Sequence, residues 1–100
     1  MRIAFVGCGY VADLYMATLR RHPQLELVGV YDRDPVRTAR FAAYHALSSW
    51  ASLEDVLADD RVEAVLNLTN PGSHYEVSKA CLEAGKHVYS EKPLAMEVAQ

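Results

Sequence analysis

A glycine-rich hexapeptide near the start of the chain constrains the fold most strongly. Residues 7–12, Gly-Cys-Gly-Tyr-Val-Ala, have the pattern G-x-G-x-x-A and directly follow the short apolar run Ile3–Val6. In such a motif Gly7 permits a tight turn, Gly9 lets a pyrophosphate approach the backbone, and Ala12 lets a helix pack closely on a strand. The free N–H groups of the helix N-terminus also favour phosphate binding. The motif alone is equally compatible with a tight strand-to-helix turn that binds no ligand.

Short apolar runs recur along the chain and are separated by segments with helical periodicity. Brief runs that are apolar on both faces are typical of parallel strands covered by helices. The predicted strands are Ile3–Val6, Leu25–Val30, Ala64–Leu68 and His87–Tyr89, with a weaker candidate at Ala46–Ser49. The predicted helix faces are Val11, Leu14, Tyr15 and Thr18 in one helix, and Val77, Ala80, Cys81 and Ala84 in another. This alternation predicts an α/β fold with a doubly wound, mainly parallel sheet of the Rossmann type.

Local capping signals agree with these helices. Asp34 before Pro35 is typical of an N-cap followed by proline at the first helical position. Ser52 and Ser73 each precede an acidic residue at capping-box spacing, and both are therefore predicted N-caps. Gly85 is a predicted helix stop before the strand at His87–Tyr89.

The last residues predict a helix that is only beginning, because Pro93 is followed by LAMEVAQ. A domain rarely ends after one turn of helix. We therefore expect residues 1–100 to form a dinucleotide-binding domain at the N-terminus of a longer, two-domain protein, cut before the last strand of its sheet.

Composition narrows the class of protein. The chain has 100 residues, of which 51% are hydrophobic and 23% charged, as in an ordinary globular domain. Ten Lys and Arg against thirteen Asp and Glu give a charge of −3, which argues against a nucleic-acid partner. No apolar run approaches the ~20 residues of a membrane span, and no signal peptide is apparent, so a cytoplasmic location is expected. Cys8 and Cys81 lack metal-ligand spacing and are predicted to be buried and reduced.

An acidic residue strengthens the interpretation of the glycine motif. Asp32 ends the predicted strand LELVGVYD, twenty residues after Ala12. At this spacing a carboxylate reaches the ribose hydroxyls of a bound dinucleotide. The alternative is a loop aspartate that bonds its own backbone before Asp34. A carboxylate disfavours a 2′-phosphate and so favours NAD, but Arg33 and Arg37 follow closely and could pair with that phosphate, which leaves NADP open.

Two loops at the predicted carboxyl ends of strands contain further candidates, at residues 68–74 and 90–93. Ligands bind at this end of a parallel sheet. Lys92 could exchange a proton with a substrate hydroxyl during hydride transfer if its surroundings lower its pKa. Considered alone, however, a lysine before a proline is more often a surface residue.

Considered together, four segments resemble the N-terminal domain of the Gfo/Idh/MocA oxidoreductase family, which includes glucose–fructose oxidoreductase and inositol dehydrogenase. They are GCGYVA, VYDRD around Asp32, TNPGSH at Thr69–His74, and EAGKHVYSEKPLA at Glu83–Ala95. The resemblance covers essentially the whole chain, although many family members have T-P-N where this chain has T-N-P. Relatives continue into an α+β domain that supplies most of the substrate pocket, so we expect residues 1–100 alone to be inactive.

The resemblance implies roles for particular residues. Lys92 would be the catalytic residue near the substrate hydroxyl and nicotinamide, Glu91 and residues 69–71 would line the nicotinamide ribose, and His74 would lie near the cofactor. The complete predicted cofactor site is Gly7, Gly9, Tyr10, Val11, Ala12, Asp32, Arg33, Thr69, Asn70, Pro71, His74, Glu91 and Lys92.

The sequence therefore predicts an NAD(P)-dependent oxidoreductase that is homo-oligomeric in its full length. It would transfer a hydride to or from a secondary alcohol carbon of a sugar, polyol or related small molecule. The alternative is a non-catalytic module that senses NAD(H), although a sensor has no need of a proton-transfer group such as Lys92.

Overall fold

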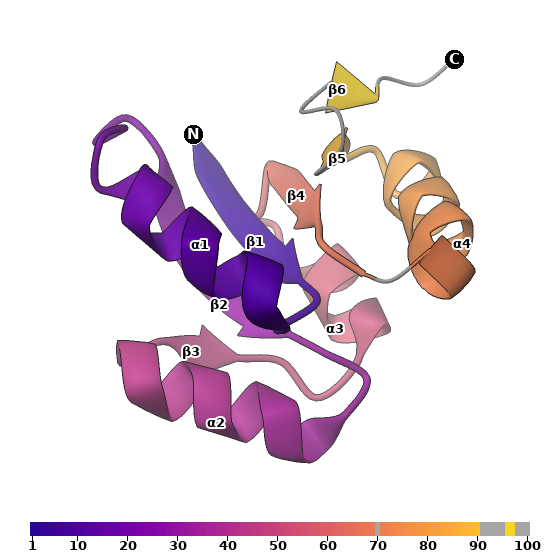
Figure 1. Cartoon of the computed structure of the whole chain (residues 1–100). Helices are drawn as coiled ribbons and strands as arrows, with labels where there is room; N and C mark the ends of the chain where they lie inside the picture. The colour runs from indigo at the N-terminus through magenta and orange to yellow at the C-terminus, as the bar shows by residue number, and fades with distance from the viewer. Residues whose placement is uncertain (70, 91–95, 98–100) are drawn as a thin grey trace.

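Strands and helices alternate in the computed structural model, which describes residues 1–69, 71–90 and 96–97 (Figure 1). In chain order the elements are β1 (Arg2–Val6), α1 (Tyr10–Leu19), β2 (Glu26–Tyr31), α2 (Pro35–His45), β3 (Ser48–Ser49), α3 (Leu53–Ala58), β4 (Ala64–Asn67), α4 (Pro71–Glu83), β5 (His87–Ser90) and β6 (Met96–Glu97). The sheet order is β3-β2-β1-β4-β5-β6, in which β1 to β5 pair in parallel and β6 pairs antiparallel with β5. The predicted α/β fold with a mainly parallel sheet is confirmed.

The chain changes direction across the sheet between β1 and β4. From β1 it proceeds through α1 to the neighbouring β2 and then to β3, whereas β4 lies on the other side of β1. The carboxyl ends of the three central strands are in register, because Val6 of β1 pairs with both Tyr31 and Asn67. At such a switch point the following loops diverge and leave a crevice beyond the strand ends. The topology therefore predicts a crevice between α1 and the end of β4.

Alternate residues of β1 enter two separate cores. Ile3 and Phe5 pack on the side of α1 and α2, whereas Ala4 and Val6 pack on the side of α3 and α4 (Figure 1). This alternation follows from the two-residue period of a strand, and it explains why the strand is apolar throughout. A central strand buried on both faces is a rigid base for the glycine loop that follows it.

The predicted buried face of α1 is confirmed only in part, because Tyr15 packs against the core but Leu14 and Thr18 do not. Leu14 is 52% exposed and Thr18 is also exposed, whereas Ala12 is fully buried and Met16 and Leu19 pack against the core. The small side chain of Ala12 belongs to the same core cluster as Ile3 and Phe5 of β1. The helix therefore rotates so that the residues one turn and two turns after Ala12 face the core.

Most predicted helix ends are confirmed. The Asp34 carboxylate accepts hydrogen bonds from the N–H groups of the first turn of α2, and Ser52 accepts one from Asp55. Gly85 ends α4 with a φ of +82°, and the N–H groups of Gly85 and Lys86 bond to carbonyls of the last turn. These two bonds form the Schellman arrangement that favours glycine.

The predicted N-cap at Ser73 is wrong, because α4 begins at Pro71 and Ser73 is its third residue. Proline fits the first helical position, where its missing N–H would have no helical partner. At 13 residues α4 is the longest helix in the described part of the chain, and none of the helices there has the length and apolar character that crossing a membrane requires.

The helix predicted after Pro93 is also wrong where the structure describes it. Met96 and Glu97 form β6 and pair with Tyr89 and Val88 of β5. Pro93 itself lies outside the described residues. An unpaired edge strand leaves N–H and C=O groups without partners. Pairing with β5 satisfies such groups, and this tertiary effect prevails over the local helical pattern.

Candidate functional site

The glycine loop follows β1 and makes a turn that only glycine fits. Gly7 has a φ of +105°, and its N–H donates a hydrogen bond of 2.7 Å to the Tyr31 carbonyl. A Cβ at Gly7 would lie 2.6 Å from the carbonyl carbon of Leu68, beyond the end of β4. Gly7 therefore lets the ends of β1, β2 and β4 lie close together.

Gly9 is different, because nothing in the described part of the chain occupies the space beside it. A Cβ there would have no heavy atom within 4 Å, and its φ of −86° is open to any residue. Gly9 is also the N-cap of α1, where serine or aspartate would stabilise the helix more. Neither packing nor backbone strain explains a glycine at this position, whereas the close approach of a phosphate group to the helix N-terminus does.

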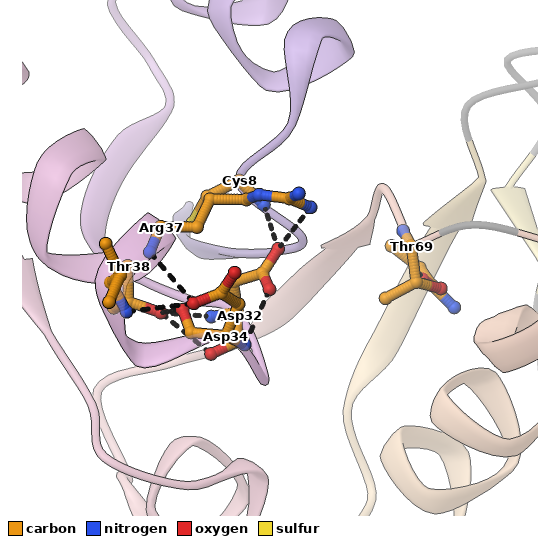
Figure 2. A network of polar contacts seen from close by, with 8 residues as sticks. Cys8, Asp32, Asp34, Arg37, Thr38 and Thr69 are labelled. Carbon is orange, nitrogen blue, oxygen red and sulfur yellow. Dashed lines mark hydrogen bonds and ion pairs between the residues drawn. The ribbon is translucent and has the colours of Figure 1, made fainter.

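Asp32 faces the glycine loop from the end of β2. Its Oδ2 accepts a hydrogen bond from the Cys8 N–H at 2.9 Å, and its Oδ1 accepts one from the Asp34 N–H at 2.9 Å (Figure 2). The Thr38 hydroxyl holds the backbone of Asp32 by accepting from its N–H at 2.9 Å and donating to its carbonyl at 2.7 Å. Asp32 therefore bonds nearby backbone, as the alternative interpretation expected, and its carboxylate also lies at the rim of the glycine loop. Its contact with a ribose stays a prediction.

The charge around Asp32 is mixed. Arg37 Nη1 lies 3.8 Å from Asp32 Oδ2, and the Arg37 side chain is 55% exposed against 11% for Asp32. Arg33 is exposed next to them. Burial raises the pKa of the Cys8 thiol to about 12, and the Asp32 carboxylate adds to that shift. Cys8 therefore stays a neutral, unreactive thiol in the loop, and both cysteines are free and buried as predicted.

Beyond β4, a buried amide organises the opposite rim. Asn67 is 0% exposed at the end of β4. Its Oδ1 accepts from the Thr69 hydroxyl at 2.6 Å and from the Thr69 N–H at 3.2 Å. Its Nδ2 donates to the His74 carbonyl at 3.0 Å and to the Ser78 hydroxyl at 2.8 Å, both in α4. Figure 2 shows Thr69 well separated from the cluster around Asp32, on the other side of the site.

A cleft of about 790 Å³ lies between these two rims. Such a volume is in the range of small-molecule and cofactor sites. It is lined by Val6, Gly7, Gly9, Val11, Tyr31, Asp32, Arg33, Asp34, Arg37, Leu53, Leu68, Thr69, Ser73, Glu76 and Val77. The glycine loop lies between the Asp32 rim and the Thr69 rim, as the order β2-β1-β4 requires.

The structure brings together most of the predicted cofactor residues that it describes. Gly7, Gly9, Val11, Asp32, Arg33 and Thr69 all line the cleft, and Ala12 packs beneath it. His74 is half-buried in α4 and is not among the lining residues. Asn70, Glu91 and Lys92 lie outside the described residues, and so do the side chains of Tyr10 and Pro71.

Sequence reasoning missed the wall that α3 and α4 contribute. Leu53 begins α3, and Ser73, Glu76 and Val77 project from α4 into the cleft. Their spacing of three and four residues on one helix face is a signal that could have been used. Asn67 was also missed, although a polar residue inside the apolar run Ala64–Leu68 is unusual enough to be noticed.

The donor and acceptor groups fit a dinucleotide. The open space at Gly9 and the N-terminus of α1 suit a pyrophosphate, and the Asp32 carboxylate suits ribose hydroxyls. Apolar side chains of Leu53, Val77 and Val11 line the same cleft. The residues of this chain are therefore compatible with a bound dinucleotide.

Comparison with known proteins agrees with that fit. The whole chain, residues 1–100, matches the model of the Gfo/Idh/MocA family, which is described as an oxidoreductase family with an NAD-binding Rossmann fold. The chain is 38% identical to 4-carboxy-2-hydroxymuconate-6-semialdehyde dehydrogenase of Sphingobium sp., over 95% of this chain and 30% of that protein. It is 30% identical to scyllo-inositol 2-dehydrogenase (NADP(+)) of Bacillus subtilis, over 95% of this chain and 29% of that protein.

Among solved structures, the chain is similar to the WlbA dehydrogenase of Bordetella pertussis, which was determined in complex with NADH and UDP-GlcNAcA. The TM-score is 0.82 at 28% sequence identity, and the match covers 90% of this chain and 28% of that one. The chain thus spans less than a third of the length of each of these three relatives.

Proposed function

Since the chain belongs to the Gfo/Idh/MocA oxidoreductase family through its NAD-binding Rossmann fold, we propose that it is the cofactor-binding domain of a dehydrogenase that prefers NAD to NADP. The proposed reaction moves a hydride to or from a secondary alcohol carbon of a sugar, polyol or related small molecule. Relatives that are named as dehydrogenases of inositol support this substrate class.

One observation carries the proposal: the open space beside Gly9 and the carboxylate of Asp32 belong to the same cleft. The N-terminus of α1 would hold the pyrophosphate through backbone N–H groups and the positive end of the helix dipole. Asp32 would accept hydrogen bonds from the adenosine ribose. The nicotinamide half would then extend past β1 to the side of Thr69, and the strand order β2-β1-β4 supports this orientation.

A bound nicotinamide would supply the hydride acceptor or donor. The ribose contact explains the proposed preference for NAD, because the Asp32 carboxylate would repel a 2′-phosphate. Arg37 opposes this preference, since its guanidinium lies 3.8 Å from the same carboxylate. We expect Asp32 to prevail, because its carboxylate is mostly buried and held by the Cys8 and Asp34 N–H groups, whereas the Arg37 side chain is largely exposed.

The proton transfer is assigned to Lys92 on the strength of the E-K-P motif and the family resemblance. In this role the Lys92 amine would donate a proton to a carbonyl oxygen, or accept one from a hydroxyl, as the hydride moves at the adjacent carbon. In the complete enzyme, Lys92→Ala should abolish turnover and leave NADH affinity unchanged. Unchanged turnover would contradict this role. A wild-type protein that binds NADH but shows no turnover would instead favour a non-catalytic NAD(H)-sensing module.

Cofactor binding is tested by titrating the chain with NADH and NADPH and following cofactor fluorescence and quenching of Trp50. We expect saturable binding that is tighter for NADH. Asp32→Asn should weaken NADH binding by about 10- to 100-fold, the equivalent of one charge-assisted hydrogen bond. It should also shift the preference toward NADPH.

Asp60→Asn is the matched control, because Asp60 precedes β4 at the amino end of the sheet and is not among the cleft-lining residues. Its affinity for both cofactors should equal that of the wild type. Failure of the folded wild-type chain to bind either cofactor would overturn the proposal. Tighter binding of NADPH would show that Arg33 and Arg37 outweigh Asp32.

A further inference from the structure

We propose that Asn67 is a positioning residue for the cofactor, which orients the Thr69 hydroxyl as a hydrogen-bond acceptor for the nicotinamide riboside half. The inference rests on the proposed function, because it requires the dinucleotide to occupy the cleft. Asn67 itself does not line that cleft and would act only through Thr69.

The amide of Asn67 has no remaining hydrogen-bonding capacity. It is fully buried in the centre of the sheet, between Val6 of β1 and the end of β5. Both N–H bonds of its Nδ2 and both lone pairs of its Oδ1 have partners within α4 or at Thr69. Burying a polar amide is unfavourable compared with an apolar residue unless every group is satisfied. Here every group is satisfied, so the amide connects the end of β4 to α4 on one side and to Thr69 on the other.

The partners of Asn67 determine which way each hydrogen bond runs. The His74 carbonyl can only accept, so the amide must direct its N–H bonds toward α4 and its oxygen toward Thr69. The amide oxygen can also only accept, so the Thr69 hydroxyl donates its single proton to Asn67, over 2.6 Å. The free lone pairs of Thr69 Oγ1 can then serve only as acceptors for a ligand.

The position of Thr69 identifies what it would accept from. With the adenosine ribose at Asp32 and the pyrophosphate at Gly9, the rest of the cofactor extends past β1 toward β4. That half carries two ribose hydroxyls and a carboxamide NH₂, which are hydrogen-bond donors. An acceptor held rigidly at this rim complements them, whereas a freely rotating hydroxyl would lose rotational freedom on binding.

The same amide also holds α4, because two of its hydrogen bonds end at His74 and Ser78. Ser73, Glu76 and Val77 of α4 line the cleft as well. A loss of affinity in an Asn67 variant could therefore arise through Thr69 or through a displaced helix. The experiment must separate these two routes.

A double-mutant cycle does so. Asn67→Ala, Thr69→Val and the double variant are titrated calorimetrically with NADH and with ADP, which lacks the nicotinamide riboside. We expect each single variant to weaken NADH binding about two- to tenfold, as for one neutral hydrogen bond. ADP binding should change less than about twofold, within the range of effects expected for a group that makes no contact. The double variant should bind NADH no more weakly than Thr69→Val.

Thr69→Ser retains the hydroxyl and should keep wild-type affinity. Thr18→Val is the matched control for a threonine outside the cleft, since Thr18 bonds its own helix at the Leu14 carbonyl. Additive losses in the double variant, or equal losses of NADH and ADP, would mean that Asn67 acts through α4 and would overturn the inference. Unchanged NADH affinity in Asn67→Ala would also overturn it.

Thermal melts establish that each variant is folded. If Asn67→Ala is unfolded, Ser78→Ala provides the second comparison, because it removes one of the two groups of α4 that accept hydrogen bonds from the amide. It should weaken NADH binding but not ADP binding, and an unchanged NADH affinity would overturn the inference. A wild-type chain that binds neither ligand would instead refute the proposed function on which the inference rests.

Discussion

Replacing Gly7 and Gly9 separately by serine tests whether the two glycines of the loop have different roles. Gly7 has a φ of +105°, and its Cβ position lies 2.6 Å from the Leu68 carbonyl carbon. Gly9 has a φ of −86° and open space around its Cβ position. The same substitution should therefore damage folding at one position and ligand binding at the other.

The magnitudes follow from this geometry. A side chain at the φ of Gly7 costs about 1–3 kcal/mol of strain. Overlap with the Leu68 backbone adds about 1–3 kcal/mol. The sum of roughly 2–6 kcal/mol is a large part of the ~5–15 kcal/mol that stabilises a small domain. At about 4–8 °C per kcal/mol, Gly7→Ser should lower the Tm by at least ~8 °C.

Gly9→Ser should leave the Tm unchanged or slightly higher, because serine is a favourable N-cap residue for α1. It should nevertheless weaken NADH binding at least about tenfold, or ~1.4 kcal/mol, since its side chain fills the space needed by the pyrophosphate.

Circular dichroism melts and NADH titrations of both variants provide the test. A wild-type Tm for Gly7→Ser would refute the strain argument. Wild-type NADH affinity in Gly9→Ser would refute the assignment of the open space to a phosphate.

Three further predictions concern stability and reactivity. Ala46 ends α2 with a left-handed φ of 56°. Ala46→Gly should therefore raise the free energy of unfolding by about 0.5–1 kcal/mol, because the backbone strain that it relieves exceeds the added entropy of the unfolded chain. Urea denaturation measures this change, and a decrease in the free energy of unfolding would contradict the prediction. Burial raises the pKa of Cys8 to about 12 and that of Cys81 to about 11, so iodoacetamide at pH 8 should modify neither until urea unfolds the chain. Rapid alkylation of the native protein, detected by mass spectrometry, would show that the thiols are accessible and ionised. Hydrogen bonds from Arg61 hold the pKa of Asp59 well below its usual range. This stabilisation is present above the unfolded pKa of ~4 and is lost as the pH falls below it, so Asp59→Asn should flatten the decline of Tm between about pH 4 and 2. An unchanged pH profile would exclude the contribution of this carboxylate.

The type and order of the main elements could be predicted from local sequence. Apolar runs of three to six residues, capping residues such as Asp34 and Ser52, and the stop at Gly85 each act through neighbours close in the chain. Local interactions of this kind are visible in a linear pattern. The glycine motif and the spacing to Asp32 likewise predicted two parts of one cleft, because a strand–helix–strand unit has a nearly constant length.

The local sequence pattern did not predict the structure correctly where contacts with distant segments decide it. The segment after Pro93 has a helical pattern, but Met96 and Glu97 pair with the edge of β5. The predicted face of α1 was right at Tyr15 but wrong at Leu14 and Thr18, because the fully buried Ala12 and the residues one and two turns after it face the core. Both outcomes depend on which surface lies opposite, and periodicity within one segment contains no information about that surface.

By itself, the sequence determined that this chain forms an α/β unit with a glycine loop and a carboxylate twenty residues beyond it. Only the tertiary structure decided which residues lie opposite the glycine loop and this carboxylate. The sheet order brings β4 beside β1, so that Thr69 and the α4 wall close the cleft opposite Asp32. It also buries Asn67 where each of its hydrogen bonds has a single possible direction. The direction of a hydrogen bond depends on the partners across the gap, and folding brings those partners together from separate parts of the chain.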